Sequence, residues 1–348
     1  MQSVFRPFVI FFNEPNYRSG ACNTDDIGFR FQTNALGQPI RMCNARGLPG
    51  DVDIMVGGST VFGVDASGDD KTLCMEMTRK GRICLNLGFR GATSQQEVVG
   101  FHLLRRFLPK PRRIILFSGV NNCSLCSQSG TIFYKDFGGV FSEDIHFNWL
   151  ADQYRLMEAP YSFRKAKLFL KWMEELYYES DLFRLAADGM MKLKKLRWEE
   201  QGRLRHLEKP ALSFGERMEL MERHLDNDLG YWSMLSRETG SRVVYVLQPA
   251  MGWSCKQMSD AERECFEADM AYIPSMKQCI APETYDRFRN GTAELCRRHG
   301  IDFLDANEWV RNLGANTTVF TDICHLTDEG NRIVADALTG ALAAKGAL

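Results

Sequence analysis

Short apolar segments that close on a glycine or a polar turn alternate along this chain with segments of helical pattern. The apolar segments span residues 53–56, 82–86, 113–118, 242–247 and 302–305. Strands that alternate with helices usually pair in parallel, and their crossover helices cover both faces of the sheet. The pattern therefore predicts an α/β protein built as a three-layer α/β/α sandwich.

Signals for helix ends divide the chain at matching places. Residues 69–80 have a helical pattern that stops at Gly81, and Ser94 with Glu97 forms a capping box for a helix that runs to Leu108. Another helix ends at His299-Gly300, and residues 327–345 form a last helix rich in Ala and Leu. Each predicted helix lies between two strands or follows the last one, as a parallel sheet requires.

About 120 residues separate the third strand from the fourth, several times the usual crossover length. Apolar residues recur there near helical spacing, and Ser213 with Glu216 forms a second capping box. We expect an inserted helical cap over residues 123–240, a sheet domain of residues 51–122 and 241–348, and a strand and loop extension, residues 1–50, packed on the core. The cap is either an insertion buried against the sheet domain or a lid over the substrate.

Net charge and hydropathy give no indication of binding to nucleic acid or of insertion into a membrane. The 348 residues include 43 Lys and Arg against 44 Asp and Glu, so nothing global attracts nucleic acid or an anionic membrane. The apolar run Phe8 to Phe12 is too short for a signal-peptide core, and no stretch is long enough to span a bilayer. We expect a soluble, cytoplasmic protein, and the sequence leaves its oligomeric state open.

The eleven cysteines form no disulfide framework, because their number is odd and their spacing irregular. Cys123 and Cys126 make the one Cys-x-x-Cys pair, and no second pair completes a zinc site. We expect reduced thiols and neither a metal nor a cofactor, and the role of this pair stays open.

Four short motifs follow the predicted strands in an order that suits nucleophilic catalysis. Gly57-Gly58-Ser59-Thr60 exposes Ser59 after the first strand, Gly91 offers a flexible backbone N–H after the second, and Asn121 offers a carboxamide after the third. Before the last helix, Asp322 and His325 stand three residues apart, as a carboxylate and a general base for one serine hydroxyl would. Taken singly these are a helix cap, a turn, an Asx cap and a loop pair. Together and in this order they indicate a site.

This constellation resembles the SGNH, or GDSL-like, hydrolase superfamily over residues 51–122 and 241–345. The resemblance implies a five-stranded parallel, flavodoxin-like sheet and a triad in which Ser59 is the nucleophile, His325 the base and Asp322 its orienting carboxylate. It also implies an oxyanion hole built from the backbone N–H groups of Ser59 and Gly91 and the Asn121 amide, with Gly88 as the weaker alternative to Gly91.

The chain departs from the family pattern at two positions. The family's Gly-Asp-Ser-Leu has Gly58 in place of the aspartate here, and its Gly-x-Asn-Asp has Asn122 in place of the aspartate. Neither position belongs to the implied triad or oxyanion hole, so we expect the chemistry to survive. Gln248-Pro249 and Gly28-Phe29-Arg30 also resemble segments of relatives, and neither receives a role from the sequence.

The other histidines are weaker candidates for a site. We expect four of them to face solvent from helical or charged surroundings: His102, His206, His224 and His299. His146, beside Glu143 and Asp144, could reach the site only as part of the cap.

The leading hypothesis is a serine esterase that removes a short acyl group, such as acetyl, from a carbohydrate or a small metabolite. An O-acyltransferase would use the same acyl-enzyme and pass the acyl group to an acceptor hydroxyl. A lipase or thioesterase is a variant that the aromatic and Met-rich cap suggests. A binding or scaffold protein that keeps the fold without catalysis is the alternative from another class.

Overall fold

The computed structural model describes residues 3–6, 10–48, 51–129, 133–136, 138–139 and 212–345. The chain divides into two compact units, one made of Met1–Gln128 with Phe214–Leu348 and the other of Ser129–Ser213. The first unit holds the sheet. Of the second, the described residues include a short hairpin of β8 (Phe133–Tyr134) and β9 (Gly138–Gly139).

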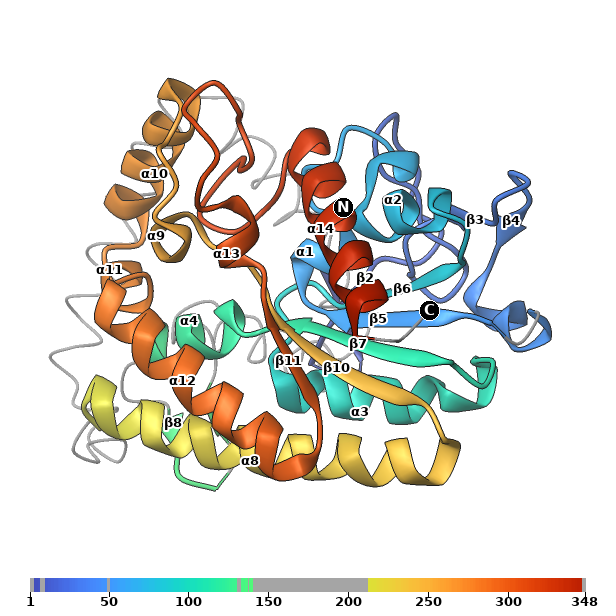
Figure 1. Cartoon of the computed structure of the whole chain (residues 1–348), viewed down its shortest axis with the longest axis horizontal. Helices are drawn as coiled ribbons and strands as arrows, with labels where there is room; N and C mark the ends of the chain where they lie inside the picture. The colour runs from blue at the N-terminus through green and yellow to red at the C-terminus, as the bar shows by residue number, and fades with distance from the viewer. Residues whose placement is uncertain are drawn as a thin grey trace, which may run out of the picture. The chain divides into compact units, whose positions relative to one another are not determined.

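A five-stranded parallel sheet forms the middle layer of the first unit (Figure 1). Its order is β11-β10-β7-β5-β6, which in order along the chain is the flavodoxin-like arrangement 2-1-3-4-5. This confirms the predicted fold class and each predicted strand. The strands are β5 (Asp53–Gly57), β6 (Cys84–Gly88), β7 (Arg113–Ser118), β10 (Arg242–Leu247) and β11 (Asp302–Asp305).

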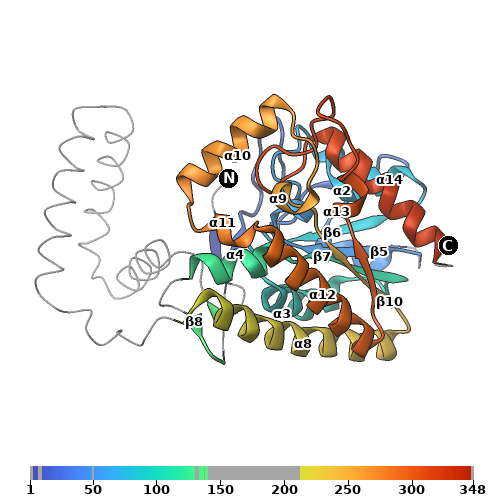
Figure 2. The same ribbon diagram turned by 60° about the vertical axis from the view of Figure 1, so that its left-hand side comes forward.

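Helices cover both faces of this sheet, as Figures 1 and 2 show. On one side lie α2 (Leu73–Arg79) and α14 (Asp328–Ala344), which pack on each other. On the other side lie α3 (Ser94–Leu104), α8 (Phe214–Thr239) and α12 (Pro282–His299). With helices on both faces, every residue of β5, β6 and β7 is buried, which explains why these strands are mostly apolar.

Further helices, strands and turns complete the described part of the sheet unit. They are β1 (Ser3–Arg6), β2 (Ile10–Asn13), β3 (Gln32–Thr33), β4 (Pro39–Ile40), α1 (Ser59–Phe62), α4 (Val120–Gln128), α9 (Met251–Ser254), α10 (Asp260–Tyr272), α11 (Met276–Cys279), α13 (Asn307–Val310) and the 3-10 turns Met42–Gly47, Asp69–Lys71 and Arg105–Phe107.

The N-terminal segment is tied to the sheet unit by polar and aromatic contacts. Arg30 is buried and pairs with Asp69 at 2.5 Å, while its guanidinium donates to the Gly63 carbonyl at 3.0 Å. The Phe29 ring packs edge-on against Phe89, with ring centroids 5.7 Å apart. The Gly28-Phe29-Arg30 segment therefore has a structural role, because its side chains hold the N-terminal residues against the sheet domain.

Two helix starts differ from the prediction. The helix expected over 69–80 is interrupted, because Thr72 is extended and its side chain caps the N-terminus of α2. The capping box of α3 is formed by Thr93 and Gln96, one residue before the predicted Ser94 and Glu97. Glu97 instead turns inward and accepts a hydrogen bond from the Ser118 hydroxyl at 2.8 Å.

The sheet unit takes in both ends of the segment that we predicted as the insertion, residues 123–240. Helix α4 and helix α8 both lie in this unit, and α8 packs on α3, α4 and α12. The apolar stripe of α8 explains this placement: Trp232, for example, packs edge-on against Phe101, with ring centroids 5.0 Å apart. The lid that we considered for the cap would be formed by residues that lie outside the described part of the chain.

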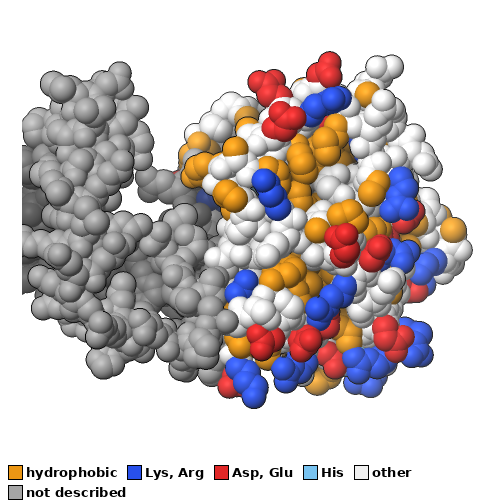
Figure 3. Space-filling view, turned by 90° about the vertical axis from the view of Figure 1, so that its left-hand side faces the viewer, with side chains coloured by type: hydrophobic (Ala, Val, Ile, Leu, Met, Phe, Trp, Pro, Cys, Tyr) orange, Lys and Arg blue, Asp and Glu red, His pale blue; other side chains and the backbone are white. Residues whose placement is uncertain are grey.

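On the face of the sheet unit drawn in Figure 3, the described residues form no large patch of a single charge. Basic and acidic side chains are intermingled over its described residues there, among scattered apolar ones. In the described residues, none of the helices is both long enough and apolar enough to cross a membrane.

Candidate active site

The four predicted motifs meet at the edge of the sheet where the strands end. Ser59 begins α1 directly after β5, Gly91 follows β6, and Asn121 lies in the first turn of α4 after β7. The loop that carries Asp322 and His325 returns to this edge before α14. The carboxyl ends of parallel strands lie together, which is why residues so far apart in the sequence become neighbours.

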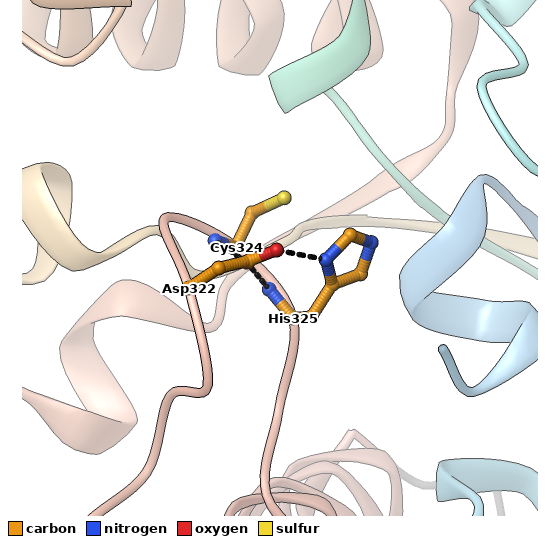
Figure 4. A group of neighbouring side chains, drawn as sticks. All are labelled: Asp322, Cys324 and His325. Atoms are coloured by element: carbon orange, nitrogen blue, oxygen red, sulfur yellow. Dashed lines mark hydrogen bonds and ion pairs between the residues drawn. The ribbon is translucent and has the colours of Figure 1, made fainter. Parts of the chain in front are cut away.

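Ser59, His325 and Asp322 form one continuous chain of hydrogen bonds. The Ser59 Oγ lies 2.6 Å from Nε2 of His325, and Nδ1 of the same ring contacts the Asp322 carboxylate. Figure 4 shows Asp322 and His325 pointing toward one another. A ring that donates from Nδ1 to the carboxylate leaves Nε2 free to accept the serine proton.

The Asp322 carboxylate is fixed by its own loop. Its second oxygen accepts the backbone N–H groups of Cys324 at 2.8 Å and of His325 at 2.7 Å. Burial raises the pKa of this carboxyl, but the hydrogen bond and charge of His325 and the two amides outweigh burial, so the net pKa is lowered. Asp322 is therefore a carboxylate over the whole neutral range.

The pKa of His325 is shifted by the same interactions in the opposite direction. Burial lowers the pKa of the imidazole, while the hydrogen bond and the charge of Asp322 raise it, and the net shift is upward from the ordinary 6.5. A more basic imidazole is a better acceptor for the proton of a serine hydroxyl. Asp65 and Asp269 add to this shift from the surrounding loops.

Both glycines before Ser59 lie in close contact with neighbouring atoms. A Cβ at Gly57 would overlap the Phe117 carbonyl of the neighbouring strand. A Cβ at Gly58 would overlap the amide nitrogen of Asn121. Gly58 thus leaves room for the Asn121 carboxamide beside the serine turn.

Asn121 and Gly91 lie on adjacent loops. The Asn121 amide donates one N–H to the Ala92 carbonyl at 2.7 Å, which leaves its second N–H unassigned. Gly91 has a φ of +74°, and a Cβ there would meet open space. Gly88, the weaker alternative, lies inside β6, where a Cβ would overlap the backbone of Phe62.

Two residues without a role in the sequence analysis connect the serine turn to the histidine loop. Gln248, at the end of β10, donates from Nε2 to the Thr60 hydroxyl at 3.1 Å. Thr60 in turn donates to the Cys324 carbonyl at 3.2 Å. Gln248 and Thr60 are both buried. The sequence signal that could have suggested them is position alone, since each directly follows a strand end or a motif residue.

A buried ion pair stabilises the segment that leads into the Asp322–His325 loop. Lys256 and Glu262 contact each other at 2.7 Å, with side chains 1% and 0% exposed. The other Glu262 oxygen accepts the backbone N–H groups of Val319 at 2.8 Å and Phe320 at 3.2 Å, shortly before the Asp-His pair of the loop. The capping box Ser259–Glu262 at the start of α10 is the signal that could have singled out this glutamate.

One group of side chains in the described residues has donor atoms close enough for a metal ion: Asp322, Cys324 and His325 (Figure 4). Both ring nitrogens of His325 are already partnered, by Asp322 and by Ser59. Burial and the charge of Asp322 raise the pKa of the Cys324 thiol well above its ordinary value, so the thiol is neutral. The donor set therefore suits a proton chain better than a cation.

The Cys-x-x-Cys pair lies inside α4. Cys123 and Cys126 are both buried free thiols, and burial is the largest cause that raises the pKa of each. Neutral buried thiols react slowly, so the pair resembles core packing rather than a redox centre. No disulfide links any of the eleven cysteines, all of which are among the described residues.

The remaining histidines fall into three groups. His102 is exposed, as predicted, and His299 is half-buried and lies 2.7 Å from Asp226. The prediction was wrong for His224, which is 8% exposed and contacts Gln95 at 3.2 Å, because it lies on the buried stripe of α8. His146 and His206 lie outside the described residues.

No protein-family model matches the chain, and no curated protein is similar to it. Solved structures are similar at low identity. An acetyl xylan esterase has 13% identity and a TM-score of 0.40, over 84% of this chain and 99% of that one. A carbohydrate acetylesterase family member from Sinorhizobium meliloti has 12% identity and a TM-score of 0.39, over 84% and 97%. A GDSL-like lipase from Bacteroides thetaiotaomicron has 12% identity and a TM-score of 0.40, over 85% and 89%.

Proposed function

We propose that this chain is a serine esterase of the SGNH type, with Ser59 as its nucleophile. The observation that carries the proposal is the unbroken hydrogen-bond chain from the Ser59 hydroxyl through His325 to Asp322. Nucleophile, base and orienting carboxylate stand in the order that acyl transfer needs. No other described residues are required for the proton transfers.

In the proposed acylation step, Ser59 Oγ bonds to the ester carbonyl carbon while Nε2 of His325 takes the hydroxyl proton. The carbonyl π electrons move to oxygen, giving a tetrahedral intermediate. Its collapse breaks the bond to the leaving alkoxide, which receives the proton from His325. A water molecule then repeats the sequence on the acyl-enzyme and releases the carboxylic acid and free Ser59.

The negative oxygen of the intermediate would be bound by three donors. The backbone N–H groups of Ser59 and Gly91 are two of them, and the second N–H of the Asn121 carboxamide is the third. The open space beside Gly91 supports this role, as does the contact that holds Asn121 against Ala92. Losing one such donor typically slows acyl transfer about 10²–10³-fold.

The substrate class that we propose is a short O-acyl ester, such as an acetyl group on a carbohydrate or a small metabolite. The resemblance of the four motif blocks to SGNH hydrolases supports it. The test is turnover of p-nitrophenyl acetate and of an acetylated sugar by wild type, by Ser59→Ala and by Ser19→Ala, an exposed serine that serves as the matched control. Turnover by wild type and Ser19→Ala but not by Ser59→Ala is expected, and equal turnover by Ser59→Ala would overturn the proposal.

A further inference from the structure

The N-terminal segment contacts the loop that follows β6 through the side chain of Asn13, the last residue of β2. Its amide nitrogen donates to the Gly88 carbonyl at 3.0 Å, and its amide oxygen accepts the backbone N–H of Arg90 at 3.4 Å. A backbone carbonyl can only accept and a backbone N–H can only donate, so these two partners fix the orientation of the amide. Asn13 is 0% exposed, so its amide is shielded from water.

The residue between these two contacts is Phe89, and its ring packs against two rings of the same N-terminal segment. The ring centroids of Phe12 and Phe29 lie 5.6 Å and 5.7 Å from that of Phe89, and all three rings are buried. Gly28 permits this close packing, because its φ of +114° suits glycine and a Cβ there would overlap the Asn13 carbonyl. The backbone of residues 88–90 is therefore fixed by two hydrogen bonds and by the packing of the ring between them.

The contacts of Asn13 end one residue before Gly91, which lies in a tight turn. The Ala92 N–H closes this turn by donating to the Phe89 carbonyl at 3.0 Å, and the φ of +74° at Gly91 is typical of the third residue of a type II turn. Within the described part of the chain, the N–H groups of Arg90 and Ala92 each have an acceptor, whereas that of Gly91 has none. The Gly91 N–H is therefore the donor of this turn that is left for a substrate oxygen.

We propose that Asn13 is a positioning residue for the oxyanion hole. By donating to the Gly88 carbonyl and accepting the Arg90 N–H, it fixes the peptide planes that lead to Gly91. The Gly91 N–H is then held in place before the negative oxygen develops, and no free energy is spent on reorganising the loop during the reaction. The proposal rests on the proposed esterase function, which assigns Gly91 to the oxyanion hole. It adds that the N-terminal segment, outside the four motifs, contributes to the geometry of the active site.

The test compares Asn13→Ala and Asn13→Leu with Asn23→Ala, each in the full chain. Leucine has nearly the shape of asparagine, so Asn13→Leu removes both hydrogen bonds without opening a cavity. Asn23 is the matched control, because it lies in the same N-terminal segment and its amide donates to Asp69 at 2.7 Å. Asn23→Ala therefore weakens the attachment of the segment and leaves the hydrogen bonds to Gly88 and Arg90 intact.

We expect kcat for p-nitrophenyl acetate to fall about tenfold or more in both Asn13 variants, with KM within about threefold of wild type, because the oxyanion forms only in the transition state. Asn23→Ala should keep kcat within about threefold of wild type, even where its urea unfolding midpoint falls as far as theirs. Wild-type kcat in a folded Asn13 variant would overturn the proposal, as would a loss confined to KM. An equal loss of kcat in Asn23→Ala would also overturn it, because attachment of the segment would then explain the loss.

Amide hydrogen exchange separates this proposal from the proposed function, because it needs no ester. In wild type we expect slow exchange at Arg90 and Ala92 and fast exchange at Gly91, measured by fragmentation mass spectrometry. In the Asn13 variants exchange at Arg90 should become about tenfold faster or more, and Asn23→Ala should leave it unchanged. If wild type turns over no ester, the esterase assignment fails, and the positioning of the turn is judged by these rates. Equal exchange at Arg90 and Gly91 in wild type would overturn the proposal even if neither Asn13 variant folds.

Discussion

Thr60 and Cys324 are joined by a hydrogen bond of 3.2 Å from the threonine hydroxyl to the cysteine carbonyl. Thr60 directly follows Ser59, and Cys324 directly precedes His325. The bond therefore links the two backbone segments whose separation sets the distance between Ser59 and His325. Gln248 completes this link by donating to the same threonine hydroxyl at 3.1 Å.

Thr60→Val keeps the shape of the side chain and removes this link. The Cys324 carbonyl loses its donor and Gln248 its acceptor, so the histidine loop is free to shift against Ser59. We expect kcat to fall about 10-fold to 100-fold with a small change in KM. Steady-state ester hydrolysis checks this, with Thr60→Ser as the control that keeps the hydroxyl and the activity. Equal losses in both variants would show that the hydroxyl is not responsible.

Gly58→Ala should damage the site through Asn121. The added Cβ would overlap the Asn121 amide nitrogen. The displaced amide would no longer serve the oxyanion, and we expect kcat to fall about 10²–10³-fold. Gly20→Ala is the matched control, because a Cβ at Gly20 meets nothing within 4 Å. A Gly58→Ala variant with normal kcat would contradict this prediction.

The pH dependence of kcat/KM should have an acid limb set by His325. The base must be neutral to accept the serine proton, so activity rises as pH rises through the imidazole pKa. Because Asp322 raises this pKa, the limb should lie above pH 6.5. Asp322→Asn removes the charge, so its residual activity should show a limb moved to lower pH, together with a large loss of kcat. A limb that does not move would mean that another group titrates.

Glu262→Gln should lower stability more than replacing the whole ion pair. The single change leaves the Lys256 ammonium buried without its counter-charge, which typically costs about 3–5 kcal/mol. The double variant Lys256→Met with Glu262→Gln removes the charge and should recover much of that loss. Urea unfolding measures both, and a double variant less stable than Glu262→Gln would contradict this explanation.

The sheet and the Ser59–His325–Asp322 constellation could be predicted because their signals are local. Residues 114–117 of β7, for example, are all apolar, since both faces of this strand are buried. The spacing of Asp322 and His325 puts the carboxylate within reach of the ring inside one short loop. Gly57 and Gly58 mark the serine turn in the sequence itself: a Cβ would overlap the Phe117 backbone at the first position and the Asn121 side chain at the second.

The supporting residues could not be predicted because their roles depend on distant partners. Gln248 and Thr60 are 188 positions apart, and no local pattern connects them. Ser94 resembles an N-cap, yet it is the first residue of α3, with Asn122 bound to it, and Thr93 caps the helix. The end of the inserted segment, expected at residue 240, lies at Ser213 in the structure for a similar reason. The apolar stripe of α8 is visible in the sequence, but the surface that it covers is not.

The most direct test of the account is to locate the adduct of a fluorophosphonate by peptide mass spectrometry. We expect one phosphonyl group per chain, attached to Ser59, and a labelling rate that falls sharply in His325→Ala but not in the exposed-histidine control His102→Ala. Absence of the adduct from folded wild-type protein would contradict the central claim that Ser59 is an activated nucleophile. An adduct on another residue, or labelling of Ser59 that is unchanged without His325, would contradict it equally.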